Sequence, residues 1–179
     1  MIYRLGETYF VRPLAEADVF GSYPRWFEDQ DVCRYNSHGK FFKPLEYYRE
    51  YVAAIEKESR LVWAICHDVD GHVGNVSLQE ITRIDRNADF GIMLGDRRHW
   101  GRGLGFLAAQ RMFAHGFDKL NLERIYCSTA ATNAGMRRVA EKLGMTHEGT
   151  RRGHIFLEGA RVDVVDFGIR RGEFTARPS

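Results

Sequence analysis

Hydrophobic and polar residues follow two different periods along the chain, and the changes of period separate predicted strands from predicted helices. Residues 61–67 form a short, mostly apolar run, Asp70 and Gly71 give a hairpin-turn signal, and residues 72–79 return as the partner strand. A second turn signal, Glu158 with Gly159, joins two later strand patterns. The other predicted strands cover residues 9–12, 86–94, 124–129, 146–156 and 161–170.

Apolar residues at helical spacing predict the helices. Behind Pro44 they recur at Leu45, Tyr48, Val52 and Ile55, which predicts a helix that ends near Ser59. One or two short helices are predicted within residues 13–35, and longer ones at 103–119 and at 133–143, where Gly144 ends the pattern. The order of elements predicts a mixed α/β sheet with a hairpin region first, a βαβα unit in the centre and a long hairpin last. Neither repeats nor a linker interrupt it, so we expect one domain over residues 1–179.

The composition fits a folded protein of 179 residues, 44% of them hydrophobic. No apolar run approaches the roughly 20 residues of a membrane span, and the first ten residues show no secretion signal, so we expect a cytoplasmic protein without a membrane partner. The three cysteines, Cys33, Cys66 and Cys127, have no C-x-x-C spacing and predict reduced thiols. The spacing of the histidines predicts no shared metal site; those weighed were His99, His115, His147 and His154.

Charge is distributed unevenly although the net charge is only +2. Residues 1–96 carry 11 basic and 16 acidic side chains, whereas residues 97–179 carry 15 and 8. This pattern suits a later half that binds a polyanion and an earlier half that receives a cation, but chance variation of surface charge gives the same pattern. The arginines are dispersed and lack interleaved aromatic residues, which argues against a nucleic-acid partner.

The junction of residues 92–105 carries the strongest chemical signal. Gly101, Gly103 and Gly105 stand at alternate positions before a predicted helix, whose first N–H groups have no acceptor within the helix. Arg97, Arg98 and Arg102 bring positive charge to the same place, which favours a pyrophosphate. A plain helix start is the alternative. The spacing matches neither a P-loop nor G-x-G-x-x-G.

The string Arg98-x-x-Gly101-x-Gly103 is similar to the Q/R-x-x-G-x-G/A signature of the GNAT superfamily of N-acetyltransferases, in which this loop binds the pyrophosphate of coenzyme A. The likeness covers roughly residues 8–172. Other segments resemble the family's splayed fourth strand (89–94), its N…E-K-x-G-F segment (Asn133 with 141–145), and the closing hairpin of the ribosomal-protein alanine acetyltransferase branch (148–151 and 163–169).

The resemblance implies an α/β GNAT-like fold: a mostly antiparallel sheet, flanked by helices, with a V-shaped splay between two parallel strands. It also implies acetyl-CoA as co-substrate, no metal, and direct attack by a primary amine that belongs to a protein N-terminus, an amino sugar, a polyamine or another small molecule. The cofactor-binding residues implied are Ile92, Met93, Leu94, Arg97, Arg98, His99, Trp100, Gly101, Arg102, Gly103, Leu104, Gly105, Asn133 and Arg137.

Proton transfer has less distinct candidates. Asp89 and Glu80 lie on or beside the predicted central strands and could take the proton of the amine, although salt-bridged or solvated carboxylates would look the same. Asn133 resembles a cofactor-contacting asparagine and could equally cap its helix. The family's usual tyrosine and serine positions hold Ala140 and Met136 here, so the resemblance names no proton donor. Tyr126, Ser128 or a water held by Asn133 are the substitutes.

The acceptor side is expected among the first helices and the final hairpin, by resemblance to the family. Trp26, Tyr35 and Asn36 are the candidate contacts, with Glu28, Asp29 and Asp31 nearby for a cationic or sugar-like amine. A packed helix end with solvated acids is the alternative. A homodimer through sheet edges is compatible with this architecture. A non-catalytic acyl-CoA-binding or interaction module on the same fold is the alternative function.

Overall fold

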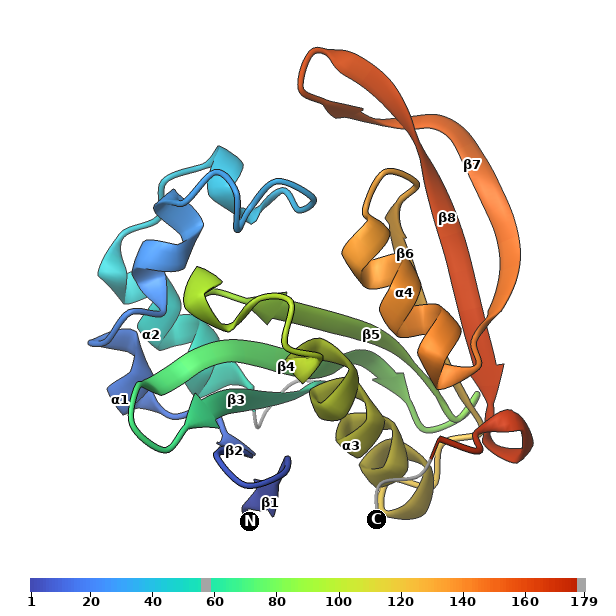
Figure 1. Cartoon of the computed structure of the whole chain (residues 1–179), viewed down its shortest axis with the longest axis horizontal. Coiled ribbons are helices and arrows are strands. Elements are labelled where there is room, and N and C mark those ends of the chain that lie inside the picture. The colour runs from blue at the N-terminus through green and yellow to red at the C-terminus, as the bar shows by residue number, and fades with distance from the viewer. Residues whose placement is uncertain (56–58, 177–179) are drawn as a thin grey trace.

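A computed structural model describes residues 1–55 and 59–176. Within them one mixed sheet of eight strands has the order β1-β2-β3-β4-β5-β6-β8-β7. Neighbouring strands are antiparallel except for β5 and β6, which are parallel (Figure 1). The fold class predicted from the sequence is therefore confirmed. Among the described residues, no helix is both long and apolar enough to cross a membrane.

The strands agree with the predicted ones to within a few residues. The bounds are β1 Tyr3–Arg4, β2 Tyr9–Pro13, β3 Leu61–His67, β4 Gly71–Thr82, β5 Asn87–Leu94, β6 Arg124–Ala130, β7 Thr146–Leu157 and β8 Ala160–Arg170. β1 was not predicted because two residues are too few to show a period, and it forms only by pairing with β2. β4 extends beyond residue 79 through an irregularity between Gln79 and Thr82.

The helices show where the pattern was less informative. The α-helices are α1 Glu16–Val19, α2 Leu45–Ala54, α3 Leu104–Asp118 and α4 Ala134–Leu143, and the 3-10 helices are η1 Pro24–Glu28, η2 His38–Lys40, η3 Arg97–His99 and η4 Arg171–Glu173. Pro44 is the N-cap of α2 and not its first helical residue. This helix ends at Ala54, before the predicted Ser59; residues 56–58 lie outside the described residues.

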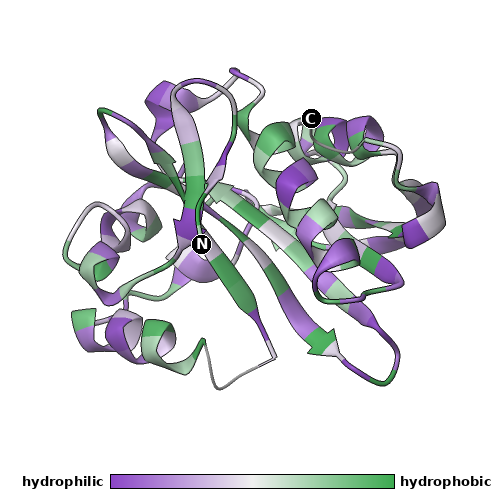
Figure 2. Cartoon of the chain, turned by 90° about the horizontal axis from the view of Figure 1, so that it is seen from below, coloured by the Kyte–Doolittle hydropathy of each residue, from purple (hydrophilic) through white to green (hydrophobic). Residues whose placement is uncertain are grey.

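The sheet separates two hydrophobic clusters. On one face, strand residues such as Leu78, Phe90 and Ile125 pack with α3 residues such as Phe113. On the other face, a smaller cluster combines β3 with the first helices; its members include Val19, Tyr23, Trp26, Tyr48 and Ala64. Figure 2 shows the sheet between these two sets of helices, with hydrophobic residues concentrated along the strands. Because side chains alternate along a strand, residues between the core positions of β5 and β6 face away from α3.

β5 and β6 separate soon after they meet. Their parallel ladder covers only three residues of each strand, from Asn87 with Arg124 to Asp89 with Tyr126. Beyond this point β6 pairs with β8 alone and β5 pairs with β4 alone, so the two strands diverge (Figure 1). The second half of β5, Phe90–Leu94, therefore presents backbone groups on the β6 side that no described strand pairs with.

Gly95 directly follows β5, at a position where no side chain fits. A Cβ there would lie 1.8 Å from Cδ2 of Trp26, which is 5% exposed. The N–H groups of Gly95 and Asp96 both donate to the Val73 carbonyl, so the backbone is fixed as well. The close approach holds η1 against the start of the glycine-rich junction.

We expect Gly95→Ala to lower the free energy of unfolding by about 3 kcal/mol or more, because the added methyl overpacks the site against a fixed indole. Denaturant unfolding measures this change. Gly172→Ala is the matched control, since a Cβ at Gly172 meets nothing within 4 Å. Equal stability of the two variants would contradict the tight contact with Trp26.

Candidate active site

The glycine-rich loop gives α3 an open N-terminus. Gly101 and Gly103 have φ angles of 74° and 75°, in the left-handed region that glycine adopts without steric cost. Gly103 is the N-cap of α3, and no side chain caps this helix. The first N–H groups of a 15-residue helix thus lack side-chain partners and point at the loop. This arrangement suits an anion, as the sequence indicated.

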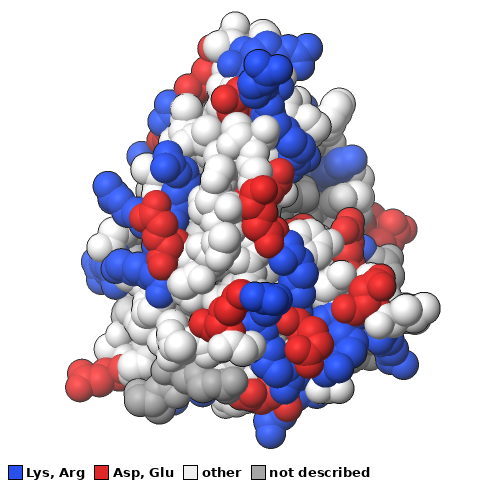
Figure 3. Space-filling view, turned by 90° about the vertical axis from the view of Figure 1, so that its right-hand side faces the viewer, with Lys and Arg blue, Asp and Glu red and all other residues white. Residues whose placement is uncertain are grey.

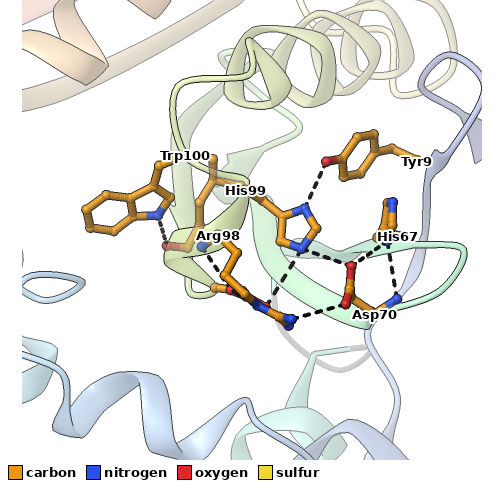
Figure 4. A network of polar contacts seen from close by, with 8 residues as sticks. Tyr9, His67, Asp70, Arg98, His99 and Trp100 are labelled. Carbon is orange, nitrogen blue, oxygen red and sulfur yellow. Dashed lines mark hydrogen bonds and ion pairs between the residues drawn. The ribbon is translucent and has the colours of Figure 1, made fainter.

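Two of the predicted cofactor-binding arginines are held by carboxylates. Arg97 lies 2.6 Å from Asp31, and its guanidinium lies over the Trp100 ring. Arg98 contacts Asp96 and also approaches Asp70, at 3.2 Å, as Figure 4 shows.

The other two predicted arginines are more available. Arg102 is exposed and makes no ion pair with any described residue. Arg137 is exposed on α4 and donates to the Ala131 carbonyl at 3.2 Å. Of these four arginines, Arg102 is therefore the one most available to bind an anion beside the N-terminus of α3.

The open edge of β5 lies next to this loop. Ile92, Met93 and Leu94 are partly buried at the diverging end of the strand. The Leu94 carbonyl accepts a hydrogen bond of 2.8 Å from the Trp100 indole, so one edge group is already occupied (Figure 4). Gly105 is close to Ile92, where a Cβ would meet its Cδ1 at 3.8 Å. The predicted strand and loop residues are thus brought together.

A carboxylate pair occupies the point where β5 and β6 separate. Burial, and secondly the charge of Glu80, raise the pKa of Asp89 to about 6 from an ordinary value of 3.8. Glu80 is exposed and accepts a hydrogen bond of 3.3 Å from the Tyr126 hydroxyl. Tyr126 is the register partner of Asp89, and burial raises its pKa. A carboxyl group that titrates near neutral pH can exchange a proton with a ligand.

Asn133 has both ends of its amide engaged. Its Oδ1 accepts from the Met136 N–H at 3.1 Å as the N-cap of α4, and its Nδ2 donates to Thr129 at 3.0 Å. The capping role is thus visible in the structure. A contact with the cofactor stays a prediction.

The predicted acceptor residues lie in two places, the hydrophobic core and the segment 34–40, which we call the arch. Trp26 is a core residue packed against Gly95, which leaves Tyr35 and Asn36 as acceptor candidates. The Tyr35 hydroxyl donates to the Thr132 carbonyl at 3.2 Å, immediately before α4. Asn36 turns to its own loop, where its Oδ1 accepts from the His38 N–H.

The arch also meets the tip of the last hairpin. Arg34 pairs with Glu158 at 2.9 Å, and the Lys40 amine donates to the Phe156 carbonyl at 3.5 Å. The segment 34–40, which follows η1 in the chain, thus reaches the loop after β6 and the tip of the β7–β8 hairpin (Figure 1). Of the nearby acids, Asp31 pairs with Arg97 and Asp29 accepts from the N–H groups of its own loop.

Comparison with known proteins identifies the family. The profile of the acetyltransferase (GNAT) domain matches residues 9–146. The chain belongs to the GNAT acetyltransferase family. This acetyltransferase is 26% identical over 166 residues to an uncharacterized N-acetyltransferase, p20, of Bacillus licheniformis, with 90% of each chain covered. It is 29% identical over 110 residues to the spermidine N(1)-acetyltransferase of Escherichia coli K12, covering 61% of this chain and 59% of the relative.

Solved structures share the fold. A spermidine N-acetyltransferase from Vibrio cholerae, in complex with CoA and spermine, superposes with a TM-score of 0.82 at 22% identity and covers 93% of this chain and 97% of its own. RimL, a ribosomal L7/L12 α-N-protein acetyltransferase in complex with CoA, gives 0.84 at 18% identity, with 95% and 98% covered. The profile match and the curated N-acetyltransferase relatives confirm the family and the enzyme class predicted from the sequence.

Two groups of residues in the acetyltransferase were not foreseen. Ser128 donates to Asp166 at 2.7 Å, and Arg151 pairs with the same carboxylate and so lowers its pKa. This group lies beside Tyr126 on the same face of the sheet, and strand alternation could have indicated it. The second group joins His99 to His67 and Asp70, from segments about thirty residues apart, and no spacing rule reveals it.

The basic later half does not form a uniform basic surface in the view of Figure 3. There the acetyltransferase shows Lys and Arg side chains mixed with Asp and Glu. Ion pairs also join the two halves of the sequence, among them Arg97 with Asp31 and Arg98 with Asp70. The uneven charge along the sequence is therefore partly neutralised in the fold.

Proposed function

We propose that this GNAT acetyltransferase transfers the acetyl group of acetyl-CoA to a primary amine by direct attack in a ternary complex. The observation that carries the proposal is the short β5–β6 ladder beside the uncapped N-terminus of α3. The open strand edge suits the amide groups of an extended pantetheine arm, and the helix end suits a pyrophosphate. That related structures contain CoA supports the same co-substrate.

The acetyl carbonyl would then lie near the point of divergence. A backbone N–H on the open half of β5, residues 90–94, is the candidate donor to the developing oxyanion. The amine attacks the carbonyl carbon, the tetrahedral intermediate breaks its C–S bond, and the products are an amide and the CoA thiol. The amine proton leaves to a base and a proton reaches the thiolate.

Asp89 is the proposed base, with Glu80 as the group that tunes it. A lysine-like amine is protonated at pH 7, and removing its proton costs about 4 to 5 kcal/mol, whereas an α-amino group costs only about 1 kcal/mol. A base with a pKa of about 6 suits the lysine-like acceptors. It is mostly ionised at neutral pH, and its pKa is close enough to the working pH for efficient proton transfer.

The proton for the thiolate has two proposed sources on the same face. Tyr126 carries a hydroxyl whose raised pKa keeps it protonated, and it already donates to Glu80. Ser128 donates to Asp166 instead. Ala140, at the usual tyrosine position, is fully buried and offers no hydroxyl. Tyr126 is the better placed of the two because it adjoins Asp89 in the ladder.

Release of free thiol from acetyl-CoA is the test. We expect it above the amine-free blank with at least one member of a panel of spermidine, lysine, 4-amino sugars, and peptides that begin with alanine or serine. Mass spectrometry of the product should show one added acetyl group. No release with any amine, together with no rise in Tm on adding CoA, would overturn the proposal; the thermal measurement separates a lost cofactor site from a missing acceptor.

A further inference from the structure

Three potential metal ligands converge where η3 meets the β3–β4 turn. His67 ends β3, Asp70 lies in the turn, and His99 ends η3. One donor atom of each lies within 4.8 Å of the other two, and no other such group occurs among the residues that the structure describes. Figure 4 shows both imidazoles directed at the Asp70 carboxylate.

His99 holds a ring nitrogen that lacks a protein partner. The residue is 2% exposed, and its Nε2 is buried without a hydrogen bond. This atom points toward Asp70 and lies 3.5 Å from its Oδ2. On the opposite side of the ring, Nδ1 lies 2.8 Å from the Tyr9 hydroxyl. If Nδ1 donates to Tyr9, Nε2 keeps the lone pair that a metal requires, as in the outer-shell contacts of known metal sites.

The Nδ1 atom of His67 faces two neighbours with opposite requirements, and a cation would remove one of the two mismatches. This Nδ1 lies 2.7 Å from Asp70 Oδ2 and also faces the Asp70 N–H at 3.2 Å. One neutral ring nitrogen is either donor or acceptor, so it cannot satisfy both neighbours. A cation bound to both Nδ1 and Oδ2 would remove the repulsion between the nitrogen lone pair and the carboxylate, while the Asp70 N–H would lose Nδ1 as its acceptor.

The local charge favours a cation. Asp70 and Asp96 both lie near His99 Nε2, at 3.5 and 3.8 Å. The opposing charges come from Arg102 and from Arg98, which pairs with Asp96 at 2.6 Å and approaches the other oxygen of Asp70, Oδ1, at 3.2 Å. Arg98 is the one of the two that contacts these acids directly. Its side chain is 69% exposed, so it can move without disturbing the core.

We propose that His67, Asp70 and His99 bind one divalent transition metal, with Zn²⁺ the first choice. Two imidazoles and a carboxylate with an open fourth position are a ligand set that Zn²⁺ accepts. The metal would hold η3, and so the start of the glycine-rich loop, against the β3–β4 turn. The proposal departs from the expectation of no metal, and it does not depend on which amine is acetylated.

Equilibrium dialysis of the EDTA-treated full chain against ZnCl₂, with metal analysis, tests the site. We expect one Zn²⁺ per chain, with at least tenfold weaker binding for His67→Gln and for Asp70→Asn. His147→Gln is the control and should bind like the wild type, because His147 is an exposed histidine on β7. Absence of stoichiometric binding, or unchanged binding by His67→Gln, would overturn the proposal and leave His67, Asp70 and His99 as a cluster of polar contacts without a metal.

Cobalt substitution provides a measurement that needs no variant. Co²⁺ bound by nitrogen and oxygen should give d–d absorption without an intense thiolate charge-transfer band. A thiolate band would instead assign the metal to a cysteine and contradict the proposed ligands. His67→Gln is preferred to a change at His99, because the His67 side chain is 17% exposed and that of His99 only 3%.

Discussion

Asp89→Asn will make the protein more stable at pH 8 and slower with strongly basic amines. The folded-state pKa of about 6 lies above the ordinary 3.8, so the folded state disfavours the charged carboxylate. The contribution of Asp89 to the free energy of unfolding is most favourable below about pH 4. It falls as the pH rises through the folded-state pKa of about 6 and stays constant at higher pH. A shift of two pKa units corresponds to about 3 kcal/mol. Because Asp89 is partly exposed, we expect Asp89→Asn to raise the free energy of unfolding at pH 8 by about 1–3 kcal/mol.

The rate should change in the opposite direction. Loss of a general base lowers kcat by roughly 10² or more with a lysine-like amine, and by much less with an α-amine, which is already partly neutral at pH 7. The wild type should show an acidic limb in kcat/KM with an apparent pKa near 6, and the variant should lose it. Thermal unfolding at pH 4 and 8, with kinetics on both amine classes, measures these effects.

Glu80→Gln is the companion variant. It removes a negative charge that raises the pKa of Asp89, so the acidic limb should move to lower pH while the base remains. If Asp89→Asn left the pH profile unchanged with every amine, Asp89 would be a partly buried carboxyl without a role in proton transfer. A gain in stability without a loss of rate would give the same answer.

Local signals were sufficient for most of the fold. The β3 strand was predicted with its observed ends, and the helix pattern that stops at Gly144 is matched by an αL C-cap at that glycine. The segment before β3 was harder, because a four-residue helix and two 3-10 turns carry too few residues to establish a period. Their positions depend on packing, above all of Trp26 against Gly95.

Only the part of the site that lies in one continuous segment of the sequence could be predicted. The glycine loop and the β5 edge are contiguous, so the sequence located them together. The pairing of Arg97 with Asp31 and the contact of Tyr35 with Thr132 join residues more than sixty positions apart. The raised pKa of Asp89 depends on burial and on Glu80, neither of which spacing reveals. Charge and acidity at the site are therefore properties of the fold.

A negative charge at the N-cap of α3 should weaken cofactor binding at least tenfold without unfolding the protein. Gly103 has φ 75° and a Cβ there would meet nothing within 4 Å, so the position has room for a side chain. Asn and Asp both tolerate this region better than other residues, and they have nearly the same shape. Gly103→Asn and Gly103→Asp therefore differ mainly by one charge.

We expect Gly103→Asp to bind CoA at least tenfold more weakly than Gly103→Asn, a difference of about 1.4 kcal/mol or more. The carboxylate would accept from the free N–H groups of the helix and repel the pyrophosphate, while the same contacts would leave the helix as stable as with Asn. Isothermal titration at two salt concentrations measures this, and the gap should narrow at high salt. Equal affinity of the two variants would show that the pyrophosphate binds elsewhere, and the uncapped end of α3 would then have no part in cofactor binding.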